Sequence, residues 1–189
     1  MRKLEQRPNS KASQLRLDPF TIFLDENHQD NPHVLRCLNE ELPAPEGYKK
    51  HKDVPFRPGE LDENWLPVVG LNGWILVSTD TRLWRRSVLR QALFAAGVRA
   101  FIFTENNLRG DTRAQILRKA LPEMRALVRD NPPPFIASLT VEGHAHLQYD
   151  LKMHRAVLRR EKAAEKRRVK RKPRRRKATK RKVAGHDSR

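Results

Sequence analysis

Cysteine, aromatic residues and long apolar runs are all scarce in this chain of 189 residues. Cys37 is the only cysteine, which excludes an intramolecular disulfide and a zinc site built from several cysteines. No apolar stretch approaches the ~18 residues that a helix needs to cross a bilayer. The N-terminal residues Met1–Pro8 also lack the apolar centre of a signal peptide. We therefore expect a soluble protein that stays in the cytoplasm and has no membrane partner.

Positive charge is present in excess, and it is gathered at one end of the chain. Residues 152–189 hold 19 Lys and Arg against three acids, a net charge of +16 out of +18 for the whole chain. The remaining 151 residues are therefore almost neutral. Hydrophobic residues make up 38% of the chain and charged residues 33%, so part of it is not expected to pack into a core. These numbers predict one α/β domain with a polycationic appendage.

Apolar spacing predicts alternating strands and helices, the signature of a mostly parallel sheet. Strands are expected at 20–25, 74–79 and 98–103, with a short one around Tyr48, and helices at 32–42, 61–72, 84–96 and 112–129. Asp111 is expected to cap the last of these helices. Residues 135–149 are expected to form a hairpin turning at Glu142-Gly143.

Composition divides the chain into three parts. We expect a flexible leader at 1–19, a folded domain at 20–150 and a polybasic tail at 151–189, part helix and part disordered. The tail helix is expected to run from Leu151 to Lys172, where Pro173 ends it.

Acidic residues follow two of the predicted strands. Asp25 and Glu26 come directly after the first, Asp80 comes directly after the second, and Asp62 and Glu63 open the helix between them. The ligand crevice of an open α/β sheet lies at the carboxyl ends of its strands. Carboxylates gathered there are the ligands that Mg²⁺ prefers, and hydrolysis of a phosphodiester by two metals needs several of them. Taken singly, each acid is also a common helix cap or turn residue.

Three segments carry a pattern in a fixed order. They are Phe23-Leu24-Asp25-Glu26-Asn27, Leu61-Asp62-Glu63-Asn64-Trp65-Leu66-Pro67 and Gly73-Trp74-Ile75-Leu76-Val77-Ser78-Thr79-Asp80. Together they resemble the PIN-like domains of toxin–antitoxin ribonucleases (VapC-like toxins), in a compact variant with a Leu-Asp-Glu start. Ala96-Gly97-Val98-Arg99 and the segment Asn131–Ile136 agree with the same resemblance, which covers residues 20–148.

This resemblance implies a PIN-like three-layer α/β/α fold with a mostly parallel sheet and a C-terminal β-hairpin. It also implies a ribonuclease that depends on Mg²⁺ or Mn²⁺. By position, Asp25, Asp62 and Asp80 would be the catalytic residues and metal ligands, with Glu26 as a further ligand. For a toxin it implies RNA as the substrate and a small antitoxin protein as a partner, and a homodimer is common among such domains.

One position departs from the pattern of the family. Many PIN domains place another acid just past the Thr-x-Asp sequence, where this chain has Thr81 and Arg82. Asn106, Asn107 and Asp111 are candidates for the missing polar ligand. A site with one metal, or an inactive site on a protein that only binds nucleic acid, therefore stays open.

Arginine and lysine supply the expected contacts to nucleic acid. The tail has no aromatic anchors for a membrane, so nucleic acid is preferred over an anionic membrane or a nuclear-localisation signal. RNA is the expected nucleic acid, with DNA as an alternative. The residues expected to bind phosphates are Arg82, Arg85, Arg86, Arg159, Arg160, Arg167, Arg168, Lys170, Arg171, Arg174, Arg175 and Arg176.

Overall fold

The computed structural model describes residues 20–57 and 59–184, except for the side chains of Glu63 and of residues 169–184. The expected leader at 1–19 lies outside the described residues. Within the described part, none of the helices combines the length and the apolar content that crossing a membrane requires.

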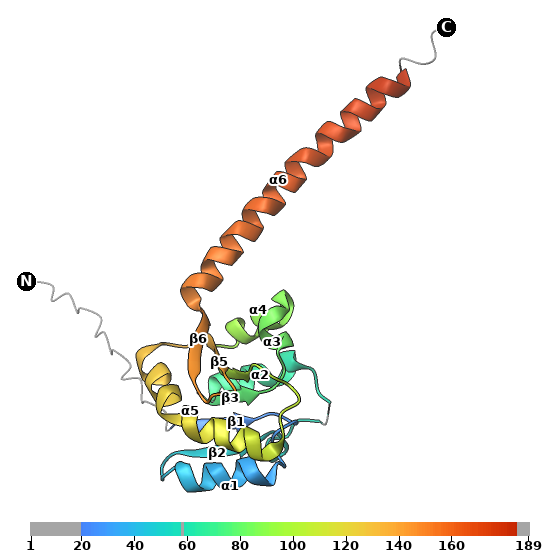
Figure 1. Ribbon diagram of the computed structural model, residues 1–189. Coiled ribbons are helices and arrows are strands. Elements are labelled where there is room, and N and C mark those ends of the chain that lie inside the picture. Colours follow the sequence, from blue (N-terminus) through green and yellow to red (C-terminus); the bar gives the residue numbers. More distant parts are fainter. Residues whose placement is uncertain (1–19, 58, 185–189) are drawn as a thin grey trace, which may run out of the picture.

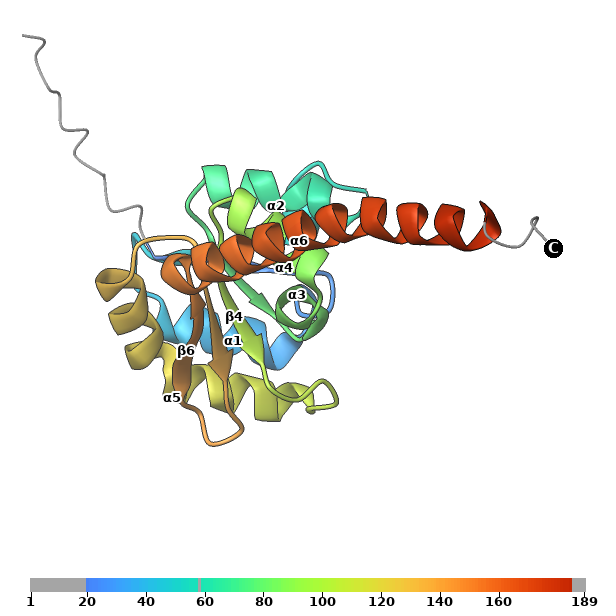
Figure 2. The same cartoon turned by 90° about the horizontal axis from the view of Figure 1, so that it is seen from above.

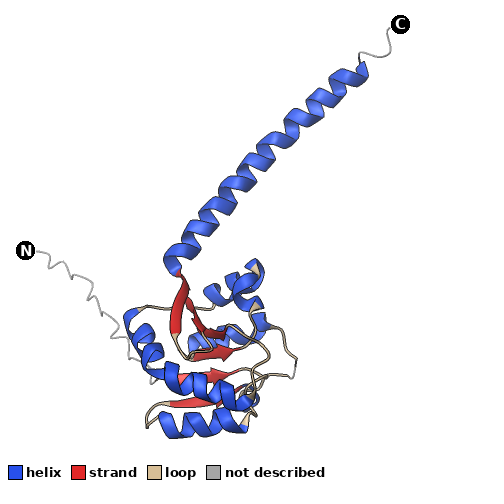
Figure 3. Ribbon diagram, in the orientation of Figure 1, coloured by secondary structure: helices blue, strands red, loops and turns tan. Residues whose placement is uncertain are grey.

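Six strands form one sheet, in the order β2-β1-β3-β4-β5-β6 (Figures 1 and 3). The first five are parallel to their neighbours, and only β6 pairs antiparallel. The expected α/β fold with a mostly parallel sheet is therefore confirmed. The strands are β1 (Thr21–Leu24), β2 (Gly47–Lys50), β3 (Ile75–Ser78), β4 (Arg99–Phe103), β5 (Phe135–Leu139) and β6 (Ala145–Asp150).

Helices cover both faces of the sheet, which makes three layers (Figure 1). They are α1 (Pro32–Glu41), α2 (Asp62–Leu71), α3 (Arg82–Arg85), α4 (Ser87–Ala95), α5 (Gly110–Asp130) and α6 (Leu151–Ala184), and a short 3₁₀ turn, η1, spans His51–Asp53. The core on one face contains residues of α1 and α5, and the core on the other contains residues of α2, α3 and α4.

Successive residues of each buried strand pack on opposite faces, because side chains alternate along a strand. In β1, Ile22 and Leu24 belong to the core under α1 and α5, whereas Phe23 belongs to the other core. The Phe23 ring stacks on those of Trp65 and Trp74, each with its centroid 5.7 Å away. Both cores are therefore anchored by a four-residue strand that is buried on both faces.

Three sequence predictions about helices are wrong. The helix expected at 84–96 is split into α3 and α4, because Arg86 has an extended backbone (φ −85°, ψ 123°). The Trp84 carbonyl at this break accepts a hydrogen bond from the Arg90 side chain (2.6 Å). Asp111 is not a cap, since α5 begins at Gly110 after Arg109, which places the Asp111 carboxylate in the first turn.

The third correction concerns the tail. Helix α6 continues through Pro173 to Ala184 instead of ending at Lys172. A proline inside a helix removes one backbone hydrogen bond and its ring clashes with the carbonyl four residues earlier, and here it is surrounded by Lys and Arg, which are good helix formers. At about 1.5 Å per residue, 34 residues form a helix about 51 Å long. Figure 1 shows it leaving the body at the end of β6 and extending away from the sheet.

Gly70 tests the packing between α2 and α4. A Cβ atom at Gly70 would lie 1.7 Å from the carbonyl oxygen of Ala96, so Gly70→Ala forces the two helix ends apart. We expect Gly70→Ala to lower the free energy of unfolding by about 1–3 kcal/mol, although alanine normally stabilises a helix. Denaturant unfolding measures this. Gly47→Ala is the matched control, because its Cβ would meet nothing within 4 Å. Equal stability of Gly70→Ala and wild type would contradict the close approach of Gly70 to the Ala96 carbonyl.

Candidate active site at the carboxyl edge of the sheet

The ends of β1 and β3 bring Asp25 and Asp80 to the same edge of the sheet. Asp25 follows β1 directly, Asp80 comes two residues after β3, and the two strands are parallel neighbours. The chain runs from β1 to β2 on one side and then returns past β1 to β3 on the other. Such a reversal of strand order is where open α/β sheets bind ligands. The sequence prediction that these two acids share an edge is confirmed.

Asp25 is buried and fully engaged in hydrogen bonds. The residue as a whole is only 7% exposed. Oδ1 accepts from the backbone N–H of Asn27 (3.1 Å) and from Nδ1 of His28 (2.7 Å), while Oδ2 accepts from the Ser78 hydroxyl. His28 is itself completely buried and stacks on Phe103. Three donors thus hold this carboxylate in a fixed orientation.

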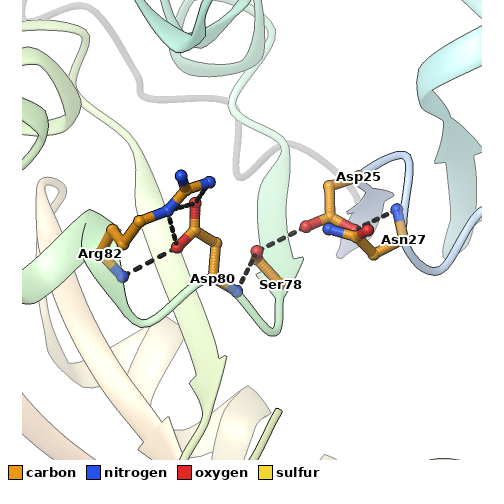
Figure 4. A network of polar contacts seen from close by, with 5 residues as sticks. All are labelled: Asp25, Asn27, Ser78, Asp80 and Arg82. Carbon is orange, nitrogen blue, oxygen red and sulfur yellow. Dashed lines mark hydrogen bonds and ion pairs between the residues drawn. The ribbon is translucent and has the colours of Figure 1, made fainter. Parts of the chain in front are cut away.

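Ser78 connects Asp25 with Asp80. Its hydroxyl donates to Asp25 and accepts a hydrogen bond from the backbone N–H of Asp80 (2.9 Å), as Figure 4 shows. Sequence reasoning did not select this serine. The signal that was present is its place two residues before Asp80, at the last position of a buried strand.

The carboxylate of Asp80 is paired with Arg82 (Figure 4). Nε of Arg82 lies 2.8 and 2.9 Å from the two carboxylate oxygens, Nη2 donates to Oδ2 at 2.7 Å, and the Arg82 backbone N–H donates to Oδ1 at 2.8 Å. Partial burial opposes ionisation of Asp80. The hydrogen bonds from Arg82, together with the charges of Arg82 and Arg86, outweigh that burial and lower its pKa. Asp80 is therefore ionised, with its negative charge matched by a neighbouring side chain.

The other predicted acids are distributed around this pair. Asp62 is the first residue of α2. The hydrogen bond and charge of Asp80 raise the pKa of Arg82, and the negative charge of Asp62 adds to the same direction. Glu26 turns toward a different loop, where Oε1 accepts from the Gly59 N–H (2.8 Å) and lies 3.5 Å from Nδ1 of His51. The side chain of Glu63 lies outside the described part of the chain.

These acids do not form a ready-made metal centre. Among the described residues, no group of three His, Cys, Asp or Glu side chains is arranged to hold a metal ion. Both oxygens of Asp25 accept hydrogen bonds, and both oxygens of Asp80 contact Arg82. The described arrangement therefore does not fit a bound cation. The assignment of Asp25, Glu26, Asp62 and Asp80 as ligands stays a prediction.

A cleft of about 390 Å³ opens beside Asp80. It is lined by Asn27, Thr79, Asp80, Arg82, Asn106 and Arg113. A second cleft of about 300 Å³ shares Asn106 with it and includes Arg85. Guanidinium groups and amides are suited to binding phosphate and sugar oxygens. Arg113, from the first turn of α5, was not selected from the sequence, because its position 31 residues after Arg82 gives no local signal.

The predicted phosphate contacts fall into three groups. Arg82 pairs with Asp80, whereas Arg85 and Arg86 are exposed nearby. On α6, the residues that the structure describes as exposed are Arg159, Arg160, Arg167 and Arg168. The structure does not describe the side chains of the remaining residues, which are Lys170, Arg171, Arg174, Arg175 and Arg176.

Comparison with known families gives a match to part of the chain. Residues 20–105 match the family model described as a PIN like domain. This segment runs from β1 to the end of β4 and contains Asp25, Asp62 and Asp80. Neither the curated proteins nor the solved structures gave a match to this chain. The match supports a PIN-like domain, and the three-layer fold is consistent with it. PIN-like domains are generally nucleases, so the match suggests a nuclease.

Ser78→Ala tests the bridge between the two acids. The substitution leaves the buried Asp25 carboxylate short of one donor and removes the acceptor for the Asp80 N–H. We expect the free energy of unfolding to fall by about 1–3 kcal/mol, measured by denaturant unfolding. The control is Ser87→Ala, at the exposed start of α4, which should change it by no more than about 0.5 kcal/mol. Equal effects of the two substitutions would show that the bridge contributes nothing.

Proposed function

We propose that this protein is a metal-dependent endoribonuclease of PIN-like type. The observation that carries the proposal is the meeting of Asp25 and Asp80 at the reversal of strand order, within the segment that matches the PIN-like domain. The adjoining cleft supports it, because Arg82 and Arg113 line a space that Asp80 also lines. An RNA phosphodiester drawn into that cleft would meet both positive and negative side chains.

The residues of the cleft have distinct roles in this proposal. Arg82 and Arg113 bind phosphate oxygens through their planar guanidinium groups. The amides of Asn27 and Asn106 contact sugar or phosphate oxygens. Asp25, held by three donors, fixes the end of β1 and, through Ser78, the position of Asp80.

Mg²⁺ or Mn²⁺ is proposed as the cofactor on the basis of the family alone. When bound, such a cation activates water and stabilises charge on a phosphodiester. Asp25, Asp62 and Asp80 are the proposed ligands, with Glu26 beside them. In the described arrangement Arg82 has the place of a cation at Asp80, so a rearrangement of Arg82 is part of the proposal.

The long helix α6 is proposed to bind RNA without selecting its sequence. Leu151 and His154 pack against the body, with the His154 ring 4.4 Å from that of Phe94, whereas residues 159–168 are all exposed. Figure 2 shows the helix passing over α4 and continuing beyond the body. Exposed basic residues follow a 3-4-3-4 spacing, which places them on one face of the helix: Lys152, Arg155, Arg159, Lys162 and Lys166.

The two acids in this part of α6 lie on a different line. Glu161 and Glu165 continue the spacing of His154 and Leu158, on the side of the helix that packs against the body. The basic stripe is thus free of acids and suits a polyanion lying along the helix. We propose RNA as this partner. By resemblance we also propose that the protein is the toxin of a toxin–antitoxin pair, with a small antitoxin protein as a further partner, and that it forms a homodimer.

A second function is favoured by the pairing of Asp80 with Arg82. A protein whose acids are already satisfied by its own side chains, beside a basic cleft, is suited to bind nucleic acid without cutting it. This alternative is a nucleic-acid-binding protein with a degenerate PIN-like site. It differs from the first proposal in one observable property, which is cleavage.

Cleavage of total RNA, single-stranded DNA and double-stranded DNA tests the proposed nuclease. We expect wild type to cut RNA in Mg²⁺ or Mn²⁺ and not in EDTA. Asp25→Asn and Asp80→Asn should each slow cutting by at least about 100-fold, because replacing even the partners of metal ligands costs up to about that factor. The control is Asp130→Asn at the far end of α5, which should cut like wild type. Binding without cutting by all four proteins would establish the alternative function.

The salt dependence of RNA binding tests the stripe on α6. Each phosphate contact with a single strand contributes about 0.7 to the slope of log K against log salt. Lys162→Gln combined with Lys166→Gln should therefore reduce the slope by about 1.4, measured by fluorescence anisotropy with labelled single-stranded RNA. Glu161→Gln combined with Glu165→Gln is the matched control on the other line of the same helix, and it should not reduce the slope. An unchanged slope in the lysine double variant would refute the role of the stripe.

A further inference from the structure

Arg82 places its positive charge next to the acids of the candidate site, at a position where those acids would otherwise attract a cation. Its guanidinium donates to both oxygens of Asp80, and the negative charge of Asp62 acts on the same group. We infer that Arg82 is a resident counter-ion that keeps divalent cations off Asp80, and that a nucleic-acid phosphate in the adjoining cleft competes for Arg82 and makes Asp80 available.

Arg82 is placed so that it can be exchanged. Its side chain is 62% exposed, whereas that of Asp80 is 16% exposed. Every hydrogen bond described for the guanidinium goes to Asp80. Water reaches the guanidinium side of this pair, whereas the carboxylate side is mostly buried and held in bidentate geometry. A phosphate can therefore reach the guanidinium without disturbing the core, and it offers the same bidentate pairing that a carboxylate offers.

The cleft contains what a competing phosphate needs. Arg82 and Arg113 both line it, and Nη2 of Arg113 donates a hydrogen bond to the backbone oxygen of Asn106 (3.1 Å). A phosphodiester in this space meets two guanidinium groups, whereas Asp80 pairs with one. The positive charge of Arg113 adds to the attraction on the phosphate and so offsets the loss of the ion pair between Arg82 and Asp80. Asp80 keeps the backbone hydrogen bond from Arg82, so the carboxylate stays oriented after the side chain leaves.

Competition of this kind couples two binding events. The free protein binds a divalent cation weakly, and a bound oligonucleotide strengthens that binding. By linkage, the cation strengthens oligonucleotide binding by the same factor. This inference rests on the proposed function only in its choice of ligands, a divalent cation and a nucleic-acid phosphate.

Mn²⁺ binding, followed by electron paramagnetic resonance of the free ion, tests the inference without using activity. Arg82→Gln removes the side-chain charge and keeps the backbone donor, so we expect it to bind Mn²⁺ at least about fivefold more tightly than wild type. Arg82→Lys keeps the charge and should resemble wild type. Arg85→Gln is the matched control, since Arg85 is exposed on the same helix and no contact with Asp80 is described for it. Combining Arg82→Gln with Asp80→Asn should abolish the gain.

The second arm adds a phosphorothioate oligonucleotide, with the oligonucleotide alone as the blank. It should tighten Mn²⁺ binding to wild type, and it should give no further gain with Arg82→Gln and little with Arg113→Gln. Equal Mn²⁺ affinities of wild type and Arg82→Gln, or a gain as large in Arg85→Gln, would overturn the inference. So would an oligonucleotide that leaves the affinity of wild type unchanged. The proposed nuclease fails separately, if wild type cuts no RNA while Arg82→Gln still gains Mn²⁺ affinity through Asp80.

Discussion

The parallel pairing of β1 with β3 is the interaction on which both the core and the candidate site depend. Each strand has four residues and is buried on both faces, so the pair supplies apolar side chains to two helical layers at once. The same pairing sets the ends of the two strands side by side, which allows Ser78 to join Asp25 to Asp80. The stability of the sheet and the geometry of the acids therefore come from one structural element.

Sequence reasoning found the acids because strand ends follow a general rule. Asp25 and Asp80 each follow a short apolar run, and parallel strands bring such residues to one edge. The pairing of Arg82 with Asp80 could not be found in this way. A contact between residues two apart depends on the turn between them, and Arg82 was predicted to bind phosphate instead. Arg113 reaches the cleft from α5 through tertiary packing, which no local pattern in the sequence encodes.

The remaining errors concern where helices begin and end. At the break at Arg86, the Arg90 side chain donates a hydrogen bond to the Trp84 carbonyl on the other side. Apolar spacing carries no information about such a bond. At Pro173, α6 continues although an interior proline loses a hydrogen bond and clashes with the preceding turn, and the residues around it are good helix formers. The strands and the longer helices were thus predictable from periodicity, whereas helix ends and the break between α3 and α4 were not.

At the site, positive and negative side chains are paired. Along the chain, the excess of positive charge is instead gathered in the C-terminal tail. At the site, Asp80 is paired with Arg82, while most of the net positive charge of the chain lies in residues 152–189. The most direct measurement of this account is the anomalous diffraction of Mn²⁺ in crystals of the protein with a non-cleavable RNA. We predict a manganese peak at the Asp80 carboxylate, with Arg82 turned to a phosphate. RNA bound in the cleft with Arg82 still on Asp80, and no peak there, would contradict the account.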